Sequence, residues 1–167
     1  MEKIIGLDLG SVTCGVAISE TGIVARALTT IRFAPDDYDE CFDKLLDLLE
    51  EHHVKTIVLG LPKHMNGDVG VRGQLSIEFG AELEKEGYHV HLWDERLTTV
   101  SAQRFLLEGD VSRKKRKKVI DQMAAVQILQ SFLDRQNGGH LILRIFLERK
   151  KNYVRFKQLI CQRRKWK

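Results

Sequence analysis

An apolar, β-prone run near the N-terminus, residues 3–10, carries a single acidic side chain, Asp8, close to its end. The run predicts a buried strand, and a buried strand rarely holds an unpaired acid. Because side chains alternate in a strand, Gly6 and Gly10 share the face of Asp8, while Ile5 and Leu7 fill the other. The missing side chains are expected to leave open space around the carboxylate, and that space suits a metal ion or a phosphate.

The rest of the pattern predicts three strands followed by alternating helices and strands. Further strands are expected over 15–19, 26–33, 56–60 and 88–93, and helices over about 42–49, 73–86, 98–107 and 119–135. Short connections favour an antiparallel meander for the first three strands. The order predicts an α/β fold, a mixed five-stranded sheet flanked by helices.

Length and composition fit one globular domain, with 167 residues of which 43% are hydrophobic. The cysteines, Cys14, Cys41 and Cys161, are far apart and form no zinc-binding pattern, so a reducing compartment is expected. No apolar run approaches the roughly 18 residues of a membrane span, and no secretion signal opens the chain. We therefore expect a soluble cytoplasmic protein without a membrane partner.

Charge divides the chain unevenly. Residues 1–139 hold 17 Lys and Arg against 22 Asp and Glu, whereas residues 140–167 hold 10 against 1. This contrast predicts a domain over 1–138 and a basic C-terminal extension over 139–167. The extension begins with an apolar heptad, 141–147, and three readings stay open: an added helix or strand, a nucleic-acid-binding tail, or a non-native segment.

One basic block stands out within the acidic body. It consists of Arg113, Lys114, Lys115, Arg116, Lys117 and Lys118, directly before an apolar helical stretch. Such a run is usually a solvated loop. Because it lies close to Asp121, phosphate binding is an equal alternative.

Two further acidic positions lie where the chain changes direction, which is where open α/β sheets collect function. Asp94 and Glu95 end the fifth strand, and strand parity cannot choose between them because they point to opposite faces. Asp121 is expected to open the last helix, on the stripe that continues through Ala125 and Ile128 toward the sheet. A carboxylate near a helix N-terminus is favoured in any case, but that does not explain the inward face.

Three carboxylates converging in a pocket of low dielectric repel one another, and a divalent cation removes that penalty. Ligation by oxygen alone suits Mg²⁺ or Mn²⁺. Two such ions about 3.5–4 Å apart activate water and stabilise a leaving oxygen. The sequence therefore predicts hydrolysis of a phosphodiester.

Four short motifs follow one another between residues 3 and 134. They are Ile5-Gly6-Leu7-Asp8-Leu9-Gly10 with Gly15-Val16-Ala17, Gly60-Leu61-Pro62 with Gly67 and Arg72, Trp93-Asp94-Glu95-Arg96-Leu97-Thr98-Thr99, and Ile120-Asp121-Gln122-Met123-Ala124-Ala125-Val126. In this order they resemble the signatures of the YqgF family. These bacterial proteins are described as Holliday junction resolvases or pre-16S rRNA nucleases and have an RNase H-like fold.

The resemblance implies that Asp8, Glu95 and Asp121 form the family's acidic triad, catalytic and metal-binding. The choice of Glu95 over Asp94 comes from the family alone. Arg96 is expected either to touch a phosphate or to pair with a nearby acid. The nucleic-acid contacts implied are Arg72, Arg96, Arg113, Lys114, Lys115, Arg116, Lys117 and Lys118.

Two positions depart from the family pattern. Many relatives have arginine where this chain has Cys14, which we interpret as a small buried hydrophobe. His64 stands where relatives commonly carry asparagine, and a solvent-exposed loop residue is the expectation there. Neither departure changes one of the three predicted acids.

These features predict a metal-dependent endonuclease for structured nucleic acid, acting on the 5′ end of pre-16S rRNA in ribosomal precursor particles. The close rival is Holliday junction resolution in branched DNA, which calls for a homodimer rather than a monomer. A non-catalytic nucleic-acid-binding module is the third reading. The pattern Gly6-x-Asp8-x-Gly10 also occurs in actin-like and sugar-kinase ATPases, but 167 residues leave no room for their second lobe.

Overall fold

The computed structural model describes residues 2–97 and 113–138, with the backbone alone for residues 97 and 113–122. The strands are β1 (Ile4–Leu9), β2 (Thr13–Ser19), β3 (Arg26–Arg32), β4 (Thr56–Leu61) and β5 (His89–Asp94). The helices are α1 (Tyr38–His52), α2 (Val71–Lys85), the 3-10 turn η1 (Glu95–Leu97) and α3 (Arg113–Gln136). The expected helix over 98–107 lies outside the described residues.

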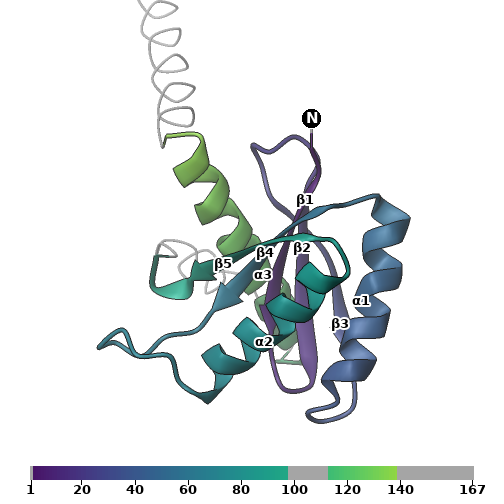
Figure 1. Cartoon of the computed structure of the whole chain (residues 1–167), viewed down its shortest axis with the longest axis vertical. Coiled ribbons are helices and arrows are strands. Elements are labelled where there is room, and N and C mark those ends of the chain that lie inside the picture. The colour runs from purple at the N-terminus through teal and green to yellow at the C-terminus, as the bar shows by residue number, and fades with distance from the viewer. Residues whose placement is uncertain (1, 98–112, 139–167) are drawn as a thin grey trace, which may run out of the picture. The chain divides into compact units, whose positions relative to one another are not determined.

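The five strands form one mixed sheet in the order β3-β2-β1-β4-β5 (Figure 1). The first three strands pair antiparallel, as the short connections predict, and β4 and β5 continue from β1 in parallel. The central position of β1 explains its apolar sequence, since it is paired on both edges and covered on both faces. The predicted mixed five-stranded sheet is confirmed.

Helices cover both faces of the sheet, with α1 and α2 on one side and α3 on the other (Figure 1). Ile5 and Leu7 of β1 belong to the core under α1 and α2. Ile4 packs on the opposite side with Ala125, Leu129 and other α3 residues. The alternation of side chains predicted for the first strand is therefore the observed one, with Asp8 on the face of α3.

The N-terminus of α1 is fixed by two side-chain hydrogen bonds. The carboxylate of the N-cap residue Asp37 accepts from the Glu40 amide (3.0 Å), one of the backbone donors that a helix start leaves unpaired. The Glu40 carboxylate accepts from the Ala34 amide (2.7 Å) and so ties the segment before the cap to the helix. At the other end His53 adopts a left-handed conformation with φ 54°, and the chain turns there into β4.

Helix α3 approaches the sheet closely because glycine leaves room for it. A Cβ atom added at Gly6 would lie 2.6 Å from Leu129 Cβ and 3.0 Å from the Ala125 carbonyl oxygen. The Gln130 side chain ties the helix to the β2–β3 connection, accepting from the Ala25 amide and donating to the Ile23 carbonyl. These contacts determine the distance between α3 and β1.

The chain divides into two compact units, residues 1–133 and 134–167. The first contains the whole sheet, and residues 134–138 are the described part of the second, so the predicted boundary after residue 138 stays a prediction. Within residues 2–97 and 113–138, no helix is both long and apolar enough to cross a membrane.

Candidate active site

Asp8 lies near the end of β1 between two glycines of the neighbouring strands. On β2 it pairs with Gly15. On β4 the last pair is Leu7 with Leu59, and the strands are parallel, so the next residue, Gly60, lies beside Asp8. Neither glycine places a side chain beside the carboxylate, which is itself half-buried. The side chains of Glu95 and Ile128 fill the space over Gly60.

The sequence predicted open space around the Asp8 carboxylate from the missing side chains at Gly6 and Gly10, and the structure does not place it there. Gly6 does not open room for Asp8, because the missing side chain at Gly6 is filled by α3. Gly10 belongs to a tight turn in which its amide donates to the Thr13 carbonyl (2.8 Å), and an added Cβ would meet that same oxygen at 2.9 Å. Strand pairing, rather than the sequence of β1 alone, determines which residues lie beside Asp8.

Glu95 follows β5 as the first residue of η1, and its carboxylate turns back toward β4. A Cβ atom added at Gly60 would lie 2.7 Å from Glu95 Oε1. Burial and, next in importance, the negative charge of Asp8 raise the pKa of Glu95 from 4.5 to about 7. The structure thus brings Asp8 and Glu95 to one place, and their charges act on each other.

Asp94 has a different role from its neighbour. The guanidinium of Arg96 donates to both Asp94 oxygens (Nε to Oδ1 3.0 Å, Nη2 to Oδ2 2.7 Å), and Lys63 Nζ lies 3.5 Å from Oδ2. These hydrogen bonds hold the pKa of the Asp94 carboxyl far below its ordinary range, with Arg96 the main cause. Of the two outcomes expected for Arg96, pairing with a nearby acid is the one found.

The third predicted acid, Asp121, needs a correction in its place along the helix. It does not open α3, which begins at Arg113. The basic block is therefore the first part of this helix and not a loop, since lysine and arginine are good helix formers. Ala125, Ile128 and Phe132 are buried against the sheet, as the predicted stripe requires. The Asp121 side chain lies outside the described part, so its approach to Asp8 stays a prediction.

Among the described side chains, no group of three His, Cys, Asp or Glu residues lies together in a way that would hold a metal ion. That set includes Asp8 and Glu95 but omits Asp121. Arg72 is exposed in the first turn of α2, and the side chains of Arg113–Lys118 are outside the description. Cys14 is fully buried, as predicted, and His64 is exposed in its loop.

The sequence prediction missed how three residues shape the site. Gly15 and Gly60 lie beside Asp8 on the two neighbouring strands. Lys63 forms an ion pair with Asp94, which also pairs with Arg96. The two glycines were visible as parts of motifs, but their position beside Asp8 depends on register. Lys63 carries no signal of its own, because an isolated lysine after a strand is ordinary surface composition.

The sheet order, the distribution of helices and the acids at the ends of β1 and β5 define an RNase H-like fold. Solved structures agree. The chain resembles Thermus thermophilus RuvC in complex with a Holliday junction substrate with TM-score 0.58 at 11% identity, covering 83% of this chain and 97% of that one. A further structure of the same protein gives TM-score 0.51 at 12% identity, covering 81% and 96%. Identities this low establish the fold alone.

Sequence comparison identifies the family. The model described as "RuvX: Holliday junction resolvase" matches residues 2–135. A relative from Oceanobacillus iheyensis named "Putative pre-16S rRNA nuclease" is 50% identical over 136 residues, covering 80% of this chain and 99% of the relative. One of the same name from Staphylococcus epidermidis is 49% identical over 135 residues, covering 79% and 95%. The chain belongs to the RuvX family, which is the YqgF family predicted from its motifs.

Proposed function

We propose that this protein is a divalent-metal-dependent endonuclease that cleaves phosphodiester bonds in structured nucleic acid. The observation that carries the proposal is the pair Asp8 and Glu95: burial and, next in importance, the negative charge of Asp8 raise the pKa of Glu95 to about 7. Two neighbouring carboxylates, one of them largely buried, are unfavourable when both are charged, and a bound cation or a proton removes this penalty. Membership of a family of nucleases supports the same chemistry.

The residues present fit a hard divalent cation such as Mg²⁺ or Mn²⁺. Carboxylate oxygens are the ligands that these ions prefer. Asp8 and Glu95 would hold the ion, with Asp121 as the third ligand. When bound, it would supply charge neutralisation at the phosphate and a more acidic water.

The chain's own residues would position the substrate around these acids. Gly15, which pairs with Asp8 on β2, places no side chain beside the carboxylate, which suits a close phosphate backbone. The cations proposed to bind phosphates are Arg72, Arg113, Lys114, Lys115, Arg116, Lys117 and Lys118. The guanidinium of Arg96 already binds Asp94, so we propose that its main role is to stabilise the turn that carries Glu95.

Replacing Arg96 with alanine separates these two roles. Without its guanidinium, Asp94 keeps the backbone amide of residue 96 and the ion pair with Lys63, and the turn carrying Glu95 is expected to loosen. Loss of such an outer partner typically costs about 10–100-fold in metal affinity. The concentration of Mg²⁺ giving half-maximal cleavage should therefore rise, with little change in the KM for nucleic acid. The reverse pattern, a raised KM at unchanged metal response, would make Arg96 a phosphate ligand instead.

The raised pKa of Glu95 predicts a pH-dependent stability in metal-free protein. The folded state binds this proton more tightly than the unfolded chain, so the contribution of Glu95 falls as pH rises from 4.5 to about 7 and is level above that. Thermal unfolding in EDTA should show this difference between the parent protein and Glu95→Gln. Mg²⁺ should raise the Tm more at a pH above 7 than below it, since there it need not displace the proton. Equal stabilisation on both sides would count against Glu95 as a ligand.

We propose precursor 16S rRNA, cleaved at its 5′ end within ribosomal precursor particles, as the substrate, which implies a cytoplasmic location. The names of the relatives that are about half identical support this choice. The description of the family model favours a second candidate, Holliday junction resolution. Symmetric cleavage of a junction requires two sites facing the branch point, hence a homodimer.

One assay separates these functions from each other and from a non-catalytic module. Labelled precursor rRNA and a labelled four-way DNA junction are incubated with the full chain and Mg²⁺ or Mn²⁺, and its mass in solution is measured in parallel. Cleavage of the rRNA by a monomer supports the proposal, whereas symmetric cleavage of the junction by a dimer supports resolution. Binding without cleavage of either, indifferent to divalent metal, would leave a binding module.

A further inference from the structure

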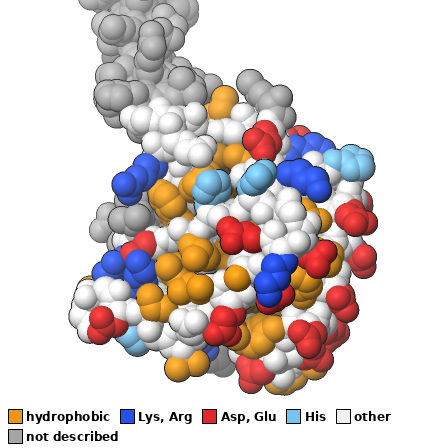
Figure 2. Space-filling model, in the orientation of Figure 1, with side chains coloured by type: hydrophobic (Ala, Val, Ile, Leu, Met, Phe, Trp, Pro, Cys, Tyr) orange, Lys and Arg blue, Asp and Glu red, His pale blue; other side chains and the backbone are white. Residues whose placement is uncertain are grey.

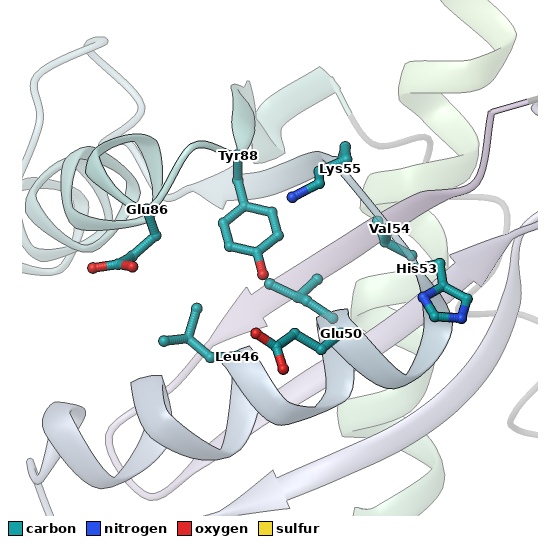
Figure 3. Close-up of a pocket in the computed structure, with 8 residues that line it drawn as sticks. Leu46, Glu50, His53, Val54, Lys55, Glu86 and Tyr88 are labelled. Atoms are coloured by element: carbon teal, nitrogen blue, oxygen red, sulfur yellow. The ribbon is translucent and has the colours of Figure 1, made fainter.

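Two separate hollows lie along α1, on the face of the sheet away from α3 and from Asp8. They have no lining residue in common, but one stripe of α1 contributes to both. The first, of about 490 Å³, is lined by Tyr38, Asp39, Phe42, Leu75, Glu78, Phe79 and Glu82. The second, of about 540 Å³, is lined by Leu46, Leu49, Glu50, His53, Val54, Lys55, Glu86 and Tyr88 (Figure 3). We call these two hollows the α1–α2 groove.

The floor of the groove is apolar. Phe42 of α1 and Phe79 of α2 meet edge to face, with ring centroids 5.5 Å apart, and so bridge the two helices. Phe42, Leu46 and Leu75 are half-buried, so each leaves apolar surface open to the groove. Positions 38, 42, 46 and 49 follow one another at helical spacing along α1. A floor of this form fits the apolar side of an amphipathic helix.

The rim of the groove is acidic. Asp39, Glu78 and Glu82 are exposed around the first hollow, and the described residues that line it include no Lys or Arg. Figure 2 shows acidic side chains gathered over the side of the molecule where α1 lies. Glu82 pairs with Lys85 at the surface, but an exposed pair of this kind is weak and exchanges readily. Such a rim repels nucleic acid and attracts Lys and Arg.

The second hollow contains a cation–π contact within the protein itself. Lys55 Nζ lies 5.1 Å from the centroid of the Tyr88 ring, a cation–π contact. Glu50, from α1, and Glu86, just after α2, lie on either side of that tyrosine (Figure 3). Aromatic and carboxylate groups therefore stand together at this end too.

We propose that the α1–α2 groove binds an amphipathic, Lys- and Arg-rich segment of a partner protein. Its apolar side chains would fill the space over Phe42 and Phe79, and its cations would meet Asp39, Glu78 and Glu82. Complementary charge sets the orientation and raises the association rate. The proposal is independent of the nuclease assignment, because it involves neither Asp8 nor Glu95.

The test uses the full chain and a fluorescent synthetic peptide of about five helical turns, with leucine along one face and lysine along the other. We expect saturable binding by anisotropy, weakened about tenfold or more by the double change Glu78→Lys, Glu82→Lys. The matched control, Glu51→Lys with Glu84→Lys, makes the same change in charge at exposed positions of α1 and α2 outside the lining. It should change the affinity less than about threefold.

A peptide of identical composition with its leucines scattered should bind about tenfold more weakly, because it presents no apolar face. Equal losses in the groove and control variants, or equal affinity for both peptides, would overturn the proposal by showing mere charge attraction. A dimer of the parent protein that the groove variant dissociates, without peptide binding, would identify a second copy as the occupant and would also overturn it. Thermal unfolding verifies that each variant is folded.

Discussion

Replacing Asp8 with asparagine is expected to lower the rate of phosphodiester cleavage on the order of 10³-fold while leaving the fold intact. Asp8 lies between the backbones of Gly15 and Gly60, and its charge is felt by Glu95. The amide keeps the size of the carboxylate but removes the charge that would hold a divalent cation. Several kcal/mol of transition-state stabilisation are lost with it.

The same substitution should not destabilise the metal-free protein. Asp8→Asn removes a like charge from beside Glu95, so the pKa of Glu95 should fall toward its ordinary 4.5. Single-turnover cleavage, calorimetric Mn²⁺ binding and thermal unfolding in EDTA together check this prediction. Asp47→Asn, an exposed residue of α1, is the control for loss of one negative charge. Cleavage by Asp8→Asn at the parental rate would remove the acid pair from the mechanism.

The fold was largely predictable because its signals are local. The buried first strand, the antiparallel meander and the parallel strands that follow all come from apolar runs, short connections and helical spacing. The start of α3 was not predictable in this way. Its first turns consist of six cations without an apolar stripe, so hydrophobic periodicity gives no signal for a helix there.

The candidate site was only partly predictable, and the reason is register. Asp8 could be recognised from its own strand, but its neighbours Gly15 and Gly60 reach it through β-sheet pairing. Likewise, strand parity could not choose between Asp94 and Glu95. In the structure Asp94 pairs with Arg96 and Lys63, which favours Glu95 as the site acid, and neither contact follows from spacing alone.

Gly60→Ala is expected to reduce cleavage by about 10–100-fold through displacement of a catalytic group. The new methyl group would lie 2.7 Å from Glu95 Oε1, 2.7 Å from Ile128 Cδ1 and 3.3 Å from the Leu7 carbonyl oxygen. The two side-chain ends can move, and the Glu95 carboxylate then leaves its present position over Gly60. Overpacking of this kind also costs about 1–3 kcal/mol in stability. Single-turnover cleavage and Mn²⁺ affinity, measured well below the Tm, report the effect.

Two further variants distinguish displacement of Glu95 from general overpacking. Gly80→Ala adds the same methyl group in α2, where its neighbours would lie at ordinary contact distances of 3.4–3.5 Å, so activity should stay parental. Combining Gly60→Ala with Ile128→Val removes the second collision and should recover stability, but not activity, because Glu95 Oε1 still meets the methyl group. Recovery of both would mean that Ile128 and the seating of α3 carry the effect. In that case the space left by Gly60 serves packing of the helix rather than placement of the carboxylate.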